Sequence, residues 1–329
     1  MSWKEYSDSN KTIGDWLPWG GIVHPFILKN RDDSLLGVIE FLKPDSGVKL
    51  NEIMFPEMDN GWSVWLEEQH YNSESHYFIT ISWNPFVSSA GTVKNVLVGD
   101  DSISERETVA YFGIVLQNFR DELNRNIKCQ LLTYQELLDF LSFTLSMGTV
   151  HVEMPETPLY INDLISQDAD IQFNTANNVI IQDNTVLTVS LPIKPNLSDV
   201  NEILSTIHDQ TYRHVQRLLL FSKEKAHNEL QRYTKSWCPG RNAIKELLLQ
   251  NLIKKINGYY SGTLFILAED YNACLDTISA KLNELRLPYR IEDYNLRDVF
   301  WGSLPGIFRA NITPPIMGFN SFNELLFIE

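Results

Sequence analysis

The sequence has few cysteines, and none of them form a closely spaced pair. Only three of the 329 residues are cysteines, namely Cys129, Cys238 and Cys274, and no Cys-x-x-Cys pair occurs. This usage differs from that of small secreted domains, which rely on several disulfides. It predicts a reducing, cytoplasmic location.

Long apolar runs are absent as well. The longest, such as Leu218 to Phe221, are far too short to span a bilayer. Near the start, the charged residues Lys4, Glu5 and Asp8 interrupt any apolar core of a signal peptide. Because 43% of the residues are hydrophobic and 12% are aromatic, we expect a globular protein rather than a disordered one. A chain of this length buries roughly three quarters of the surface that it exposes when unfolded, which predicts two domains.

The sequence lacks the common nucleotide-binding and hydrolase motifs. It contains no Gly-x-x-x-x-Gly-Lys-Ser/Thr loop to hold phosphates, and the nearest approach, Gly302 to Gly306, has no lysine and contains Pro305. Neither a dinucleotide-binding fingerprint nor a Gly-x-Ser-x-Gly elbow occurs. We therefore predict that this chain neither binds nor hydrolyses ATP and is not itself an enzyme.

Positive charge is scarce but concentrated. The net charge of −15 argues against a protein whose main role is to bind a nucleic-acid backbone. From Thr211 to Asn257, however, ten Lys or Arg stand against three Glu, whereas Asn51 to Ala110 holds ten acidic and two basic residues. These regions are either complementary docking surfaces between neighbouring subunits or solvated faces of the molecule.

The second half of the sequence contains two strand–helix–strand patterns. The first predicts a strand at Val186 to Leu191, a helix at Ser198 to His208 and a strand at Tyr212 to Phe221. The second predicts a strand at Thr263 to Leu267, a helix at Tyr271 to Leu285 and a strand at Tyr289 to Tyr294, before a turn-rich aromatic corner at Phe300 to Gly306. Two βαβ halves predict a ferredoxin-like split sheet. Right-handed crossovers would place the helices near 198–208 and 270–286 on one face of a sheet of at least four strands.

The first half predicts mainly strands, followed by two helices. A hairpin is expected from Ile22 to Leu28 and Leu35 to Phe41, and further strands from Gly61 to Glu67 and Tyr77 to Trp83. The pairs Ser104 with Glu107 and Thr133 with Glu136 are typical of capping boxes, each followed by a helical apolar stripe. We expect Gly148 to end the second helix.

The predicted fold class is α/β, of the α+β kind, with antiparallel or mixed sheets and helices. The predicted order is an N-terminal arm (1–20), an N-terminal α+β subdomain (21–155), a connection (156–184), a ferredoxin-like subdomain (185–306) with a helical insertion (223–257), and a linker (307–329). The segment Trp16 to Gly21 is predicted to be irregular because it contains Pro18, Gly20 and Gly21.

One cluster of titratable residues offers an enzymatic alternative. Glu67, Glu68, His70, Glu74 and His76 lie within a short span and have side chains that bind metals. Their spacing matches no zinc-protease motif, and alternation along a strand puts Glu67 and Glu68 on opposite faces. The cluster is therefore either an acidic or metal site or simply the polar end of a strand.

Several segments resemble one family in order and spacing. They are Trp16-Leu17-Pro18-Trp19, Gly61-Trp62-Ser63-Val64-Trp65-Leu66-Glu67, Tyr77-Phe78-Ile79-Thr80-Ile81, Met154-Pro155-Glu156-Thr157-Pro158 and Phe300-Trp301-Gly302-Ser303-Leu304-Pro305-Gly306. Together they are similar to the N-terminal domain of the CagE/TrbE/VirB conjugal-transfer ATPases of bacterial type IV secretion systems. The resemblance covers essentially the whole chain.

The resemblance implies a non-catalytic docking role. In that family the N-terminal region precedes an ATPase domain, so ATP and magnesium are expected there and no cofactor or metal is expected in this chain. The implied partners are inner-membrane subunits of the secretion system and other copies of the ATPase, without direct nucleic-acid contact. The implied location is the cytoplasmic face of the bacterial inner membrane, reached through partners. The chain is either part of a longer ATPase or a separately encoded subunit.

Two regions are predicted to face partners. Trp16 and Trp19 combine large indoles with a backbone rich in Pro and Gly, although covering the chain's own first sheet is an equal alternative. The insertion contributes the basic residues Lys223, Lys225, Arg232 and Lys235, which suit an acidic subunit or anionic headgroups.

Overall fold

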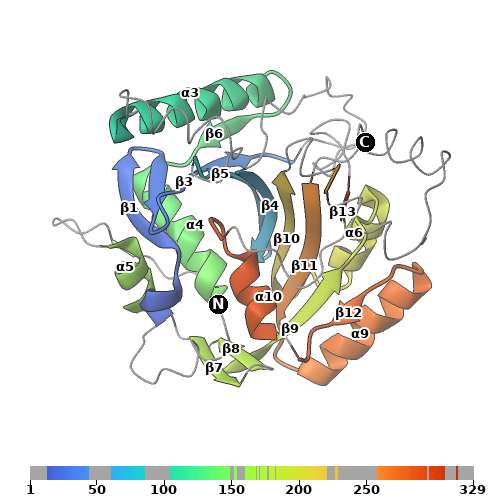
Figure 1. The fold of residues 1–329 in the computed structure, drawn as a ribbon. Helices are drawn as coiled ribbons and strands as arrows, with labels where there is room; N and C mark the ends of the chain where they lie inside the picture. Colours follow the sequence, from blue (N-terminus) through green and yellow to red (C-terminus); the bar gives the residue numbers. More distant parts are fainter. Residues whose placement is uncertain are drawn as a thin grey trace.

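The computed structural model describes most of the two halves of the chain. The described residues are 13–43, 61–85, 104–148, 152–153, 160–167, 169, 171–175, 178–181, 183–220, 227–228, 258–294, 296–307 and 316–317. Figure 1 shows a curved sheet through the middle of the molecule with helices on both sides. The α/β class expected from the sequence is confirmed.

The sheet is antiparallel at every pairing of described strands. Its main path follows the order β1-β2-β3-β5-β4-β10-β11-β9-β8-β7, with β6, β12 and β13 attached to β3, β9 and β11. The strand bounds are β1 Trp19–His24, β2 Ile27–Asn30, β3 Leu35–Phe41, β4 Trp62–Tyr71, β5 Glu74–Trp83, β6 Cys129–Leu131, β7 Ile171–Thr175, β8 Asn178–Ile181, β9 Asn184–Leu191, β10 Thr211–Leu220, β11 Gly258–Leu267, β12 Arg290–Ile291 and β13 Ile316–Met317.

The two halves of the chain meet where β4 pairs with β10. Their register runs from Tyr212 opposite His70 to Leu219 opposite Ser63, without interruption. The sheet is therefore continuous across the two subdomains expected from the sequence. The division into 21–155 and 185–306 remains a prediction about separate units.

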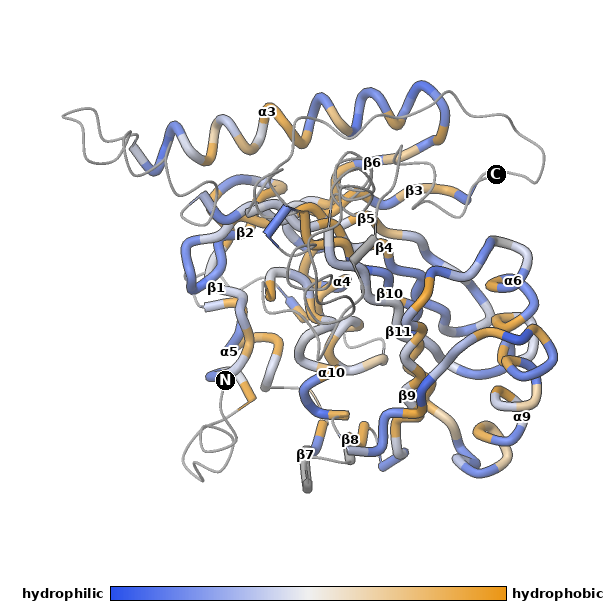
Figure 2. The backbone as a smooth tube through the Cα atoms, turned by 45° about the vertical axis from the view of Figure 1, so that its right-hand side comes forward, coloured by the Kyte–Doolittle hydropathy of each residue, from blue (hydrophilic) through white to orange (hydrophobic). Residues whose placement is uncertain are grey.

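Helices cover both faces of the sheet. On one face lie α4 (Tyr134–Ser146), α5 (Ile161–Gln167) and α10 (Leu296–Ser303), with core residues such as Val38, Trp65 and Phe265. The other face is covered at one end by α3 (Glu105–Asn124) and at the other by α6 (Leu197–Ser205) and α9 (Tyr271–Glu284). Figure 2 shows α3 across the top of the sheet and α6 with α9 at its side. Strand neighbours such as Trp65 and Leu66 point to opposite cores, as the two-residue period of a strand requires.

The capping boxes predicted from the sequence are confirmed. At the start of α3, the Ser104 amide donates to the Glu107 carboxylate at 2.8 Å, and the Glu107 amide donates back to the Ser104 hydroxyl at 3.3 Å. Thr133 and Glu136 form the same arrangement before α4. The end of α4 differs from the expectation, because Met147 rather than Gly148 takes the left-handed position, with φ 49°.

The sheet expected over residues 186–294 is confirmed. The strands β10, β11, β9 and β12 are neighbours in that order, and α6 and α9 pack into one shared core on the same face. Because β4 continues the sheet beyond β10, this half does not end as an isolated ferredoxin-like unit would. The ferredoxin-like assignment itself therefore stays a prediction.

Three local expectations were wrong. The predicted strand from Ile22 to Leu28 is instead two strands, since the chain turns at Pro25 and Phe26 between β1 and β2. The segment Trp16 to Gly21 is partly regular, because Trp16 closes a short 3-10 helix, η1 (Ile13–Trp16), and Trp19 begins β1. The corner from Phe300 to Gly306 is helical up to Ser303, where α10 ends.

Other expected segments are described only partly. The connection at 156–184 contains α5, β7 and β8, which the Pro- and Asn-rich composition did not indicate. Most of the insertion (223–257) and of the linker (307–329) lies outside the described residues, as does most of the N-terminal arm.

Candidate functional site

The corner at the end of α10 joins segments that are far apart in the sequence. The helix buries Leu296, Val299 and Phe300 in the core, and Phe300 meets Phe265 of β11 edge-on at 5.6 Å between ring centroids. After Ser303 the chain turns, and Ile307 is the last residue of this corner that the structure describes. Figure 1 shows α10 beside the middle of the sheet, next to β4 and β10.

Glycine is required where this corner closes. Gly306 has φ +89°, a conformation that residues with a side chain rarely adopt. A Cβ at this position would lie 2.5 Å from Nδ2, the side-chain amide nitrogen of Asn30. The backbone of the corner therefore packs directly onto the end of β2.

Side chains from two strands bind the carbonyl groups at the end of α10. The last carbonyls of a helix have no partner within the helix. Arg213 donates to the Ser303 carbonyl at 2.9 Å, and Arg217 donates to the Gly302 carbonyl at 3.1 Å. Trp19 donates its indole N–H to the Pro305 carbonyl at 3.0 Å. Cationic side chains also interact favourably with the negative end of a helix, so the corner is held both by hydrogen bonds and by charge.

Arg213 is at the same time one half of a buried ion pair. Its Nε and Nη2 atoms donate to the two carboxylate oxygens of Glu67 at 2.7 and 2.8 Å, and both side chains are fully buried. Its third nitrogen donates to the Ser303 hydroxyl at 2.9 Å. Glu67 also accepts hydrogen bonds from Gln69 at 2.6 Å and from Thr144 of α4 at 3.2 Å. The pair therefore links β4, β10, α4 and α10 through hydrogen-bonded polar groups.

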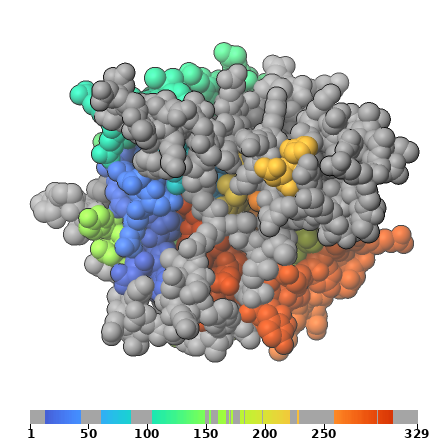
Figure 3. Space-filling view, in the orientation of Figure 1, coloured from blue at the N-terminus to red at the C-terminus, as the bar shows by residue number. Residues whose placement is uncertain are grey.

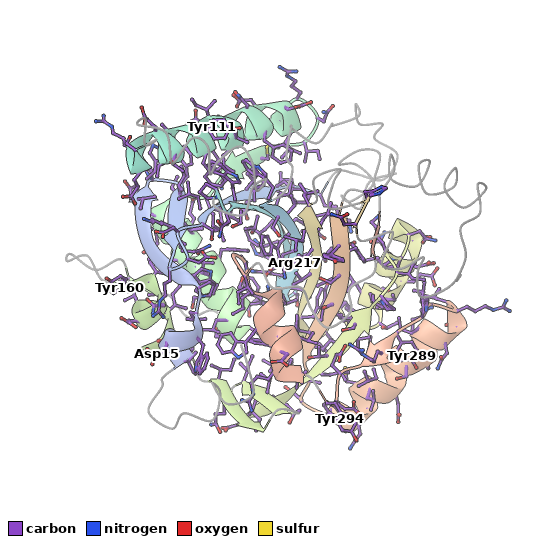
Figure 4. All side chains as sticks on the ribbon, viewed as in Figure 1. Asp15, Tyr111, Tyr160, Arg217, Tyr289 and Tyr294 are labelled. Atoms are coloured by element: carbon purple, nitrogen blue, oxygen red, sulfur yellow. The ribbon has the colours of Figure 1, made fainter. Side chains whose placement is uncertain are left out.

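Arg217 lies four residues further along the same face of β10. Its guanidinium carbon is 5.0 Å from the centroid of the Trp65 ring, within the range of a cation–π interaction. Burial lowers the pKa of Arg217 to about 9, which still leaves the group protonated at neutral pH. Figure 4 labels Arg217 at the centre of the sheet, close to the end of α10.

Trp16 and Trp19, which were predicted to face partners, lie against this corner. Trp19 is fully buried, and Trp16 is half-buried and packs against the same core as α10. The Trp19 indole is enclosed by the chain's own residues, as the alternative of covering the chain's own sheet requires, and a partner contact through Trp16 stays a prediction. The basic residues Lys223, Lys225, Arg232 and Lys235 lie outside the described residues. Figure 3 shows the blue N-terminal strands next to the red segment that contains α10.

The acidic and histidine cluster does not form a metal site. Glu67 binds Arg213 on one face of the sheet, whereas Glu68 and His70 lie on the other, where Glu68 accepts the Tyr212 hydroxyl. His76 lies 3.4 Å from Glu40 instead. Within the described ranges, no group of three or more His, Cys, Asp or Glu side chains is placed to hold a metal ion. The enzymatic alternative is not favoured.

Conjugal transfer proteins resemble this chain in sequence. No protein-family profile matches the chain. The "Conjugal transfer protein TrbE" of Rhizobium radiobacter is 20% identical over 416 residues, covering 98% of this chain and 50% of the relative. This chain is therefore similar to TrbE over nearly its whole length. A probable conjugal transfer protein of Sinorhizobium fredii, also named TrbE, is 21% identical over 221 residues, covering 59% of this chain and 33% of that protein.

These TrbE relatives confirm the resemblance inferred from the motifs. The chain spans about half the length of the Rhizobium radiobacter TrbE protein. In the structure, three of the resembling segments meet at the α10 corner: Trp16 to Trp19, Gly61 to Glu67 and Phe300 to Gly306. Three of the five motifs that carry the resemblance thus lie together in space.

The similarity of this chain to solved structures is too weak to indicate its fold or function. The protein BBE-like #28 from Arabidopsis thaliana matches with a TM-score of 0.33 and 8% identity over 76% of this chain and 42% of that one. A similar protein from Physcomitrella patens gives a TM-score of 0.32 and 11% identity over 85% and 50%. Scores this low support neither a common fold nor a common function.

Sequence reasoning missed the arginines of the corner. Arg213 and Arg217 fall four residues apart in a strand whose residues are nearly all buried, so they share one face and enter the core together. A charged pair at this spacing within a buried strand is the available signal, because such charges are rarely buried without partners.

Proposed function

We propose that this TrbE-like chain is a non-catalytic assembly and docking domain of a type IV secretion, conjugal-transfer ATPase. It would contact inner-membrane subunits of the secretion system and other ATPase protomers. The observation that carries the proposal is the similarity to TrbE along nearly the whole chain, together with the convergence of the resembling segments at the α10 corner.

The chemistry of the corner supports a structural rather than a catalytic role. Several of its polar groups are engaged by one another: Arg213 binds Glu67 and Ser303, and Trp19 binds Pro305. A buried network whose groups bond one another favours a single, rigid arrangement. Such an arrangement fits a domain that presents fixed surfaces to partners. The charged side chains of Glu67 and Arg213 are both committed to these contacts.

The location that we propose is the cytoplasmic face of the inner membrane, reached through partner subunits. Among the helices of the described residues, none combines the length and apolar character needed to cross a bilayer. We propose further that no cofactor binds this chain and that it makes no direct contact with nucleic acid, in line with its net charge of −15.

The basic residues of the insertion are the proposed partner contacts. Charged surfaces of this kind mainly guide encounter and orientation, and their effect falls as salt rises. Replacing Lys223, Lys225, Arg232 and Lys235 by Glu should therefore reduce co-purification with the inner-membrane subunits. The circular dichroism spectrum and melting temperature should stay nearly unchanged.

A second variant separates a specific surface from a change in overall charge. Arg106, Arg125 and Lys128 are exposed basic residues in and just after α3, and their replacement by Glu should leave co-purification unaltered. The outcome that contradicts the proposal is equal association of the insertion variant and the unmodified chain with the membrane subunits at low salt. The insertion would then be only a solvated face.

A further inference from the structure

A second buried polar cluster lies on the opposite face of β4 from the α10 corner. Glu68 of β4 is only 3% exposed, and its Oε1 atom accepts three hydroxyl groups. These come from Tyr212 at 2.9 Å, Ser75 at 3.0 Å and Tyr77 at 3.3 Å. Within the described part of the chain, Glu68 forms no ion pair. A buried carboxylate in this position needs positive charge or a proton nearby.

The two tyrosines can only donate to Glu68. Burial, followed by the negative charge of Glu68, raises the pKa of both Tyr77 and Tyr212 well above the usual range. Both hydroxyls therefore keep their protons at neutral pH. Three hydroxyl donors favour the ionised form of the carboxyl group that accepts them.

His70 is the group that completes this cluster. Its Nε2 atom is 2.9 Å from the His208 carbonyl oxygen, which can only accept, so Nε2 must carry a hydrogen. Its Nδ1 atom is 2.9 Å from the Ser75 hydroxyl. The ring stacks on Tyr212 at 4.8 Å between centroids, with 6° between the planes. Its orientation is thus fixed from both sides.

The hydrogen bonds of Ser75 indicate how many protons the cluster must carry. Ser75 has one hydroxyl hydrogen but lies within hydrogen-bond distance of two groups, Nδ1 of His70 and Oε1 of Glu68. If His70 is neutral and Glu68 ionised, one of these contacts sets two lone pairs against each other. One additional proton removes the conflict: His70 donates from Nδ1 to Ser75, and Ser75 donates to Glu68.

We propose that Ser75 bridges a protonated His70 to an ionised Glu68, and that this bridged pair fastens the β4–β5 hairpin to the α6–β10 loop. The hairpin contributes Glu68, His70 and Ser75, and the loop contributes the His208 carbonyl. The pair would act as a pH-dependent lock at this end of the sheet, because loss of the extra proton leaves Glu68 without a compensating charge.

Among the described residues, the other basic side chains around the pair do not form an ion pair with Glu68. Lys43 lies over the Tyr77 ring at 5.3 Å and donates to Asn201 of α6. His208 turns its ring towards the Ser205 carbonyl. On β10, burial lowers the pKa of His214 to about 4, so that this ring is neutral at neutral pH.

The lock gives stability a defined direction with pH. In the folded state the pair would bind one proton more than the same side chains bind in the unfolded chain, where a histidine titrates at about 6.5. Stability then falls as pH rises wherever the folded state holds more protons. We therefore expect this contribution to be larger at the acidic end of the pH range and to fall as pH rises.

The decisive experiment compares Ser75→Ala and His70→Gln with the unmodified chain. Urea midpoints are measured from about pH 6 to about pH 9, a range that brackets the ordinary histidine transition. Both variants should be less stable than the unmodified chain at the acidic end, and the difference should shrink as pH rises. A difference that does not change with pH would show an ordinary lost hydrogen bond and overturn the proposal.

Two controls and a second measurement accompany it. Ser205→Ala removes an exposed hydroxyl that donates only to a helix carbonyl, and His24→Gln removes an exposed histidine; neither should give a pH-dependent difference. Nitrogen-15 NMR of the histidine rings, with the His70 signals identified by their loss in His70→Gln, should show both His70 nitrogens protonated at neutral pH. A neutral ring protonated only at Nε2 under these conditions would refute the bridge.

Discussion

At the scale of single residues, the buried pair of Glu67 and Arg213 is a site where we expect substitution to be costly. Replacing Glu67 by Gln keeps the shape of the side chain but leaves the Arg213 charge in a fully buried site. We expect a loss of about 3–5 kcal/mol in the free energy of unfolding, because an uncompensated buried charge is costly. Urea denaturation followed by circular dichroism measures this change.

A double variant provides the control. Combining Glu67→Gln with Arg213→Met removes the charge that the single change strands, so the double variant should lose less than the sum of the two single losses. Simple additivity would mean that the two side chains do not stabilise each other.

Gly306 offers a second residue-scale prediction. Alanine there must adopt φ +89° and brings a Cβ to within 2.5 Å of Asn30, which predicts a loss of about 1–3 kcal/mol in unfolding free energy. Gly21→Ala is the matched control, because a Cβ there meets nothing within 4 Å. If both variants have equal melting temperatures, the strain at Gly306 is not significant.

At the scale of elements, the start of α3 depends on its capping box. Ser104→Ala removes the hydroxyl that accepts the Glu107 amide and should lower stability by about 0.5–2 kcal/mol. Ser104→Asp, which retains an accepting oxygen, should restore most of it. Thermal unfolding by circular dichroism tests both variants, and equal losses would indicate that capping is unimportant here.

The elements that the sequence predicted correctly are those with long periodic patterns. The stripe of Phe112, Leu116, Phe119 and Leu123 was sufficient for α3, and alternation was sufficient for β4 and β5. Short elements were missed because a few residues carry no period: β1 and β2 are separated only by a tight turn, and the last turn of α10 lies within the aromatic, turn-rich segment from Phe300 to Gly306.

The candidate site was harder to predict than the fold. Arg213 contacts Glu67 across 146 residues of sequence, and that contact exists only because β4 and β10 pair in one particular register. Local pattern determines each strand, but it does not determine which strands become neighbours. The surroundings of Trp19 could not be predicted for a related reason, since the Pro305 carbonyl that accepts its indole N–H is 286 residues away in the sequence.

At the scale of the whole molecule, the lack of a phosphate-binding loop leads to a direct prediction. The purified chain should neither bind ATP at micromolar concentration nor hydrolyse it, because no Gly-x-x-x-x-Gly-Lys-Ser/Thr sequence is present. Isothermal titration calorimetry and phosphate release measure the two activities. Saturable binding that a point substitution in this chain abolishes would contradict the prediction.

The pairing of β4 with β10 also determines the order in which the molecule can be completed. A ribosome releases β4 long before Thr211–Leu220 has been made, so the nascent first half holds a strand of ten residues without its neighbour. Pairings between strands so distant in sequence form slowly, and open strand edges readily join other chains. We therefore expect the edge of β4 to be most open to pairing with other chains until translation passes Leu220.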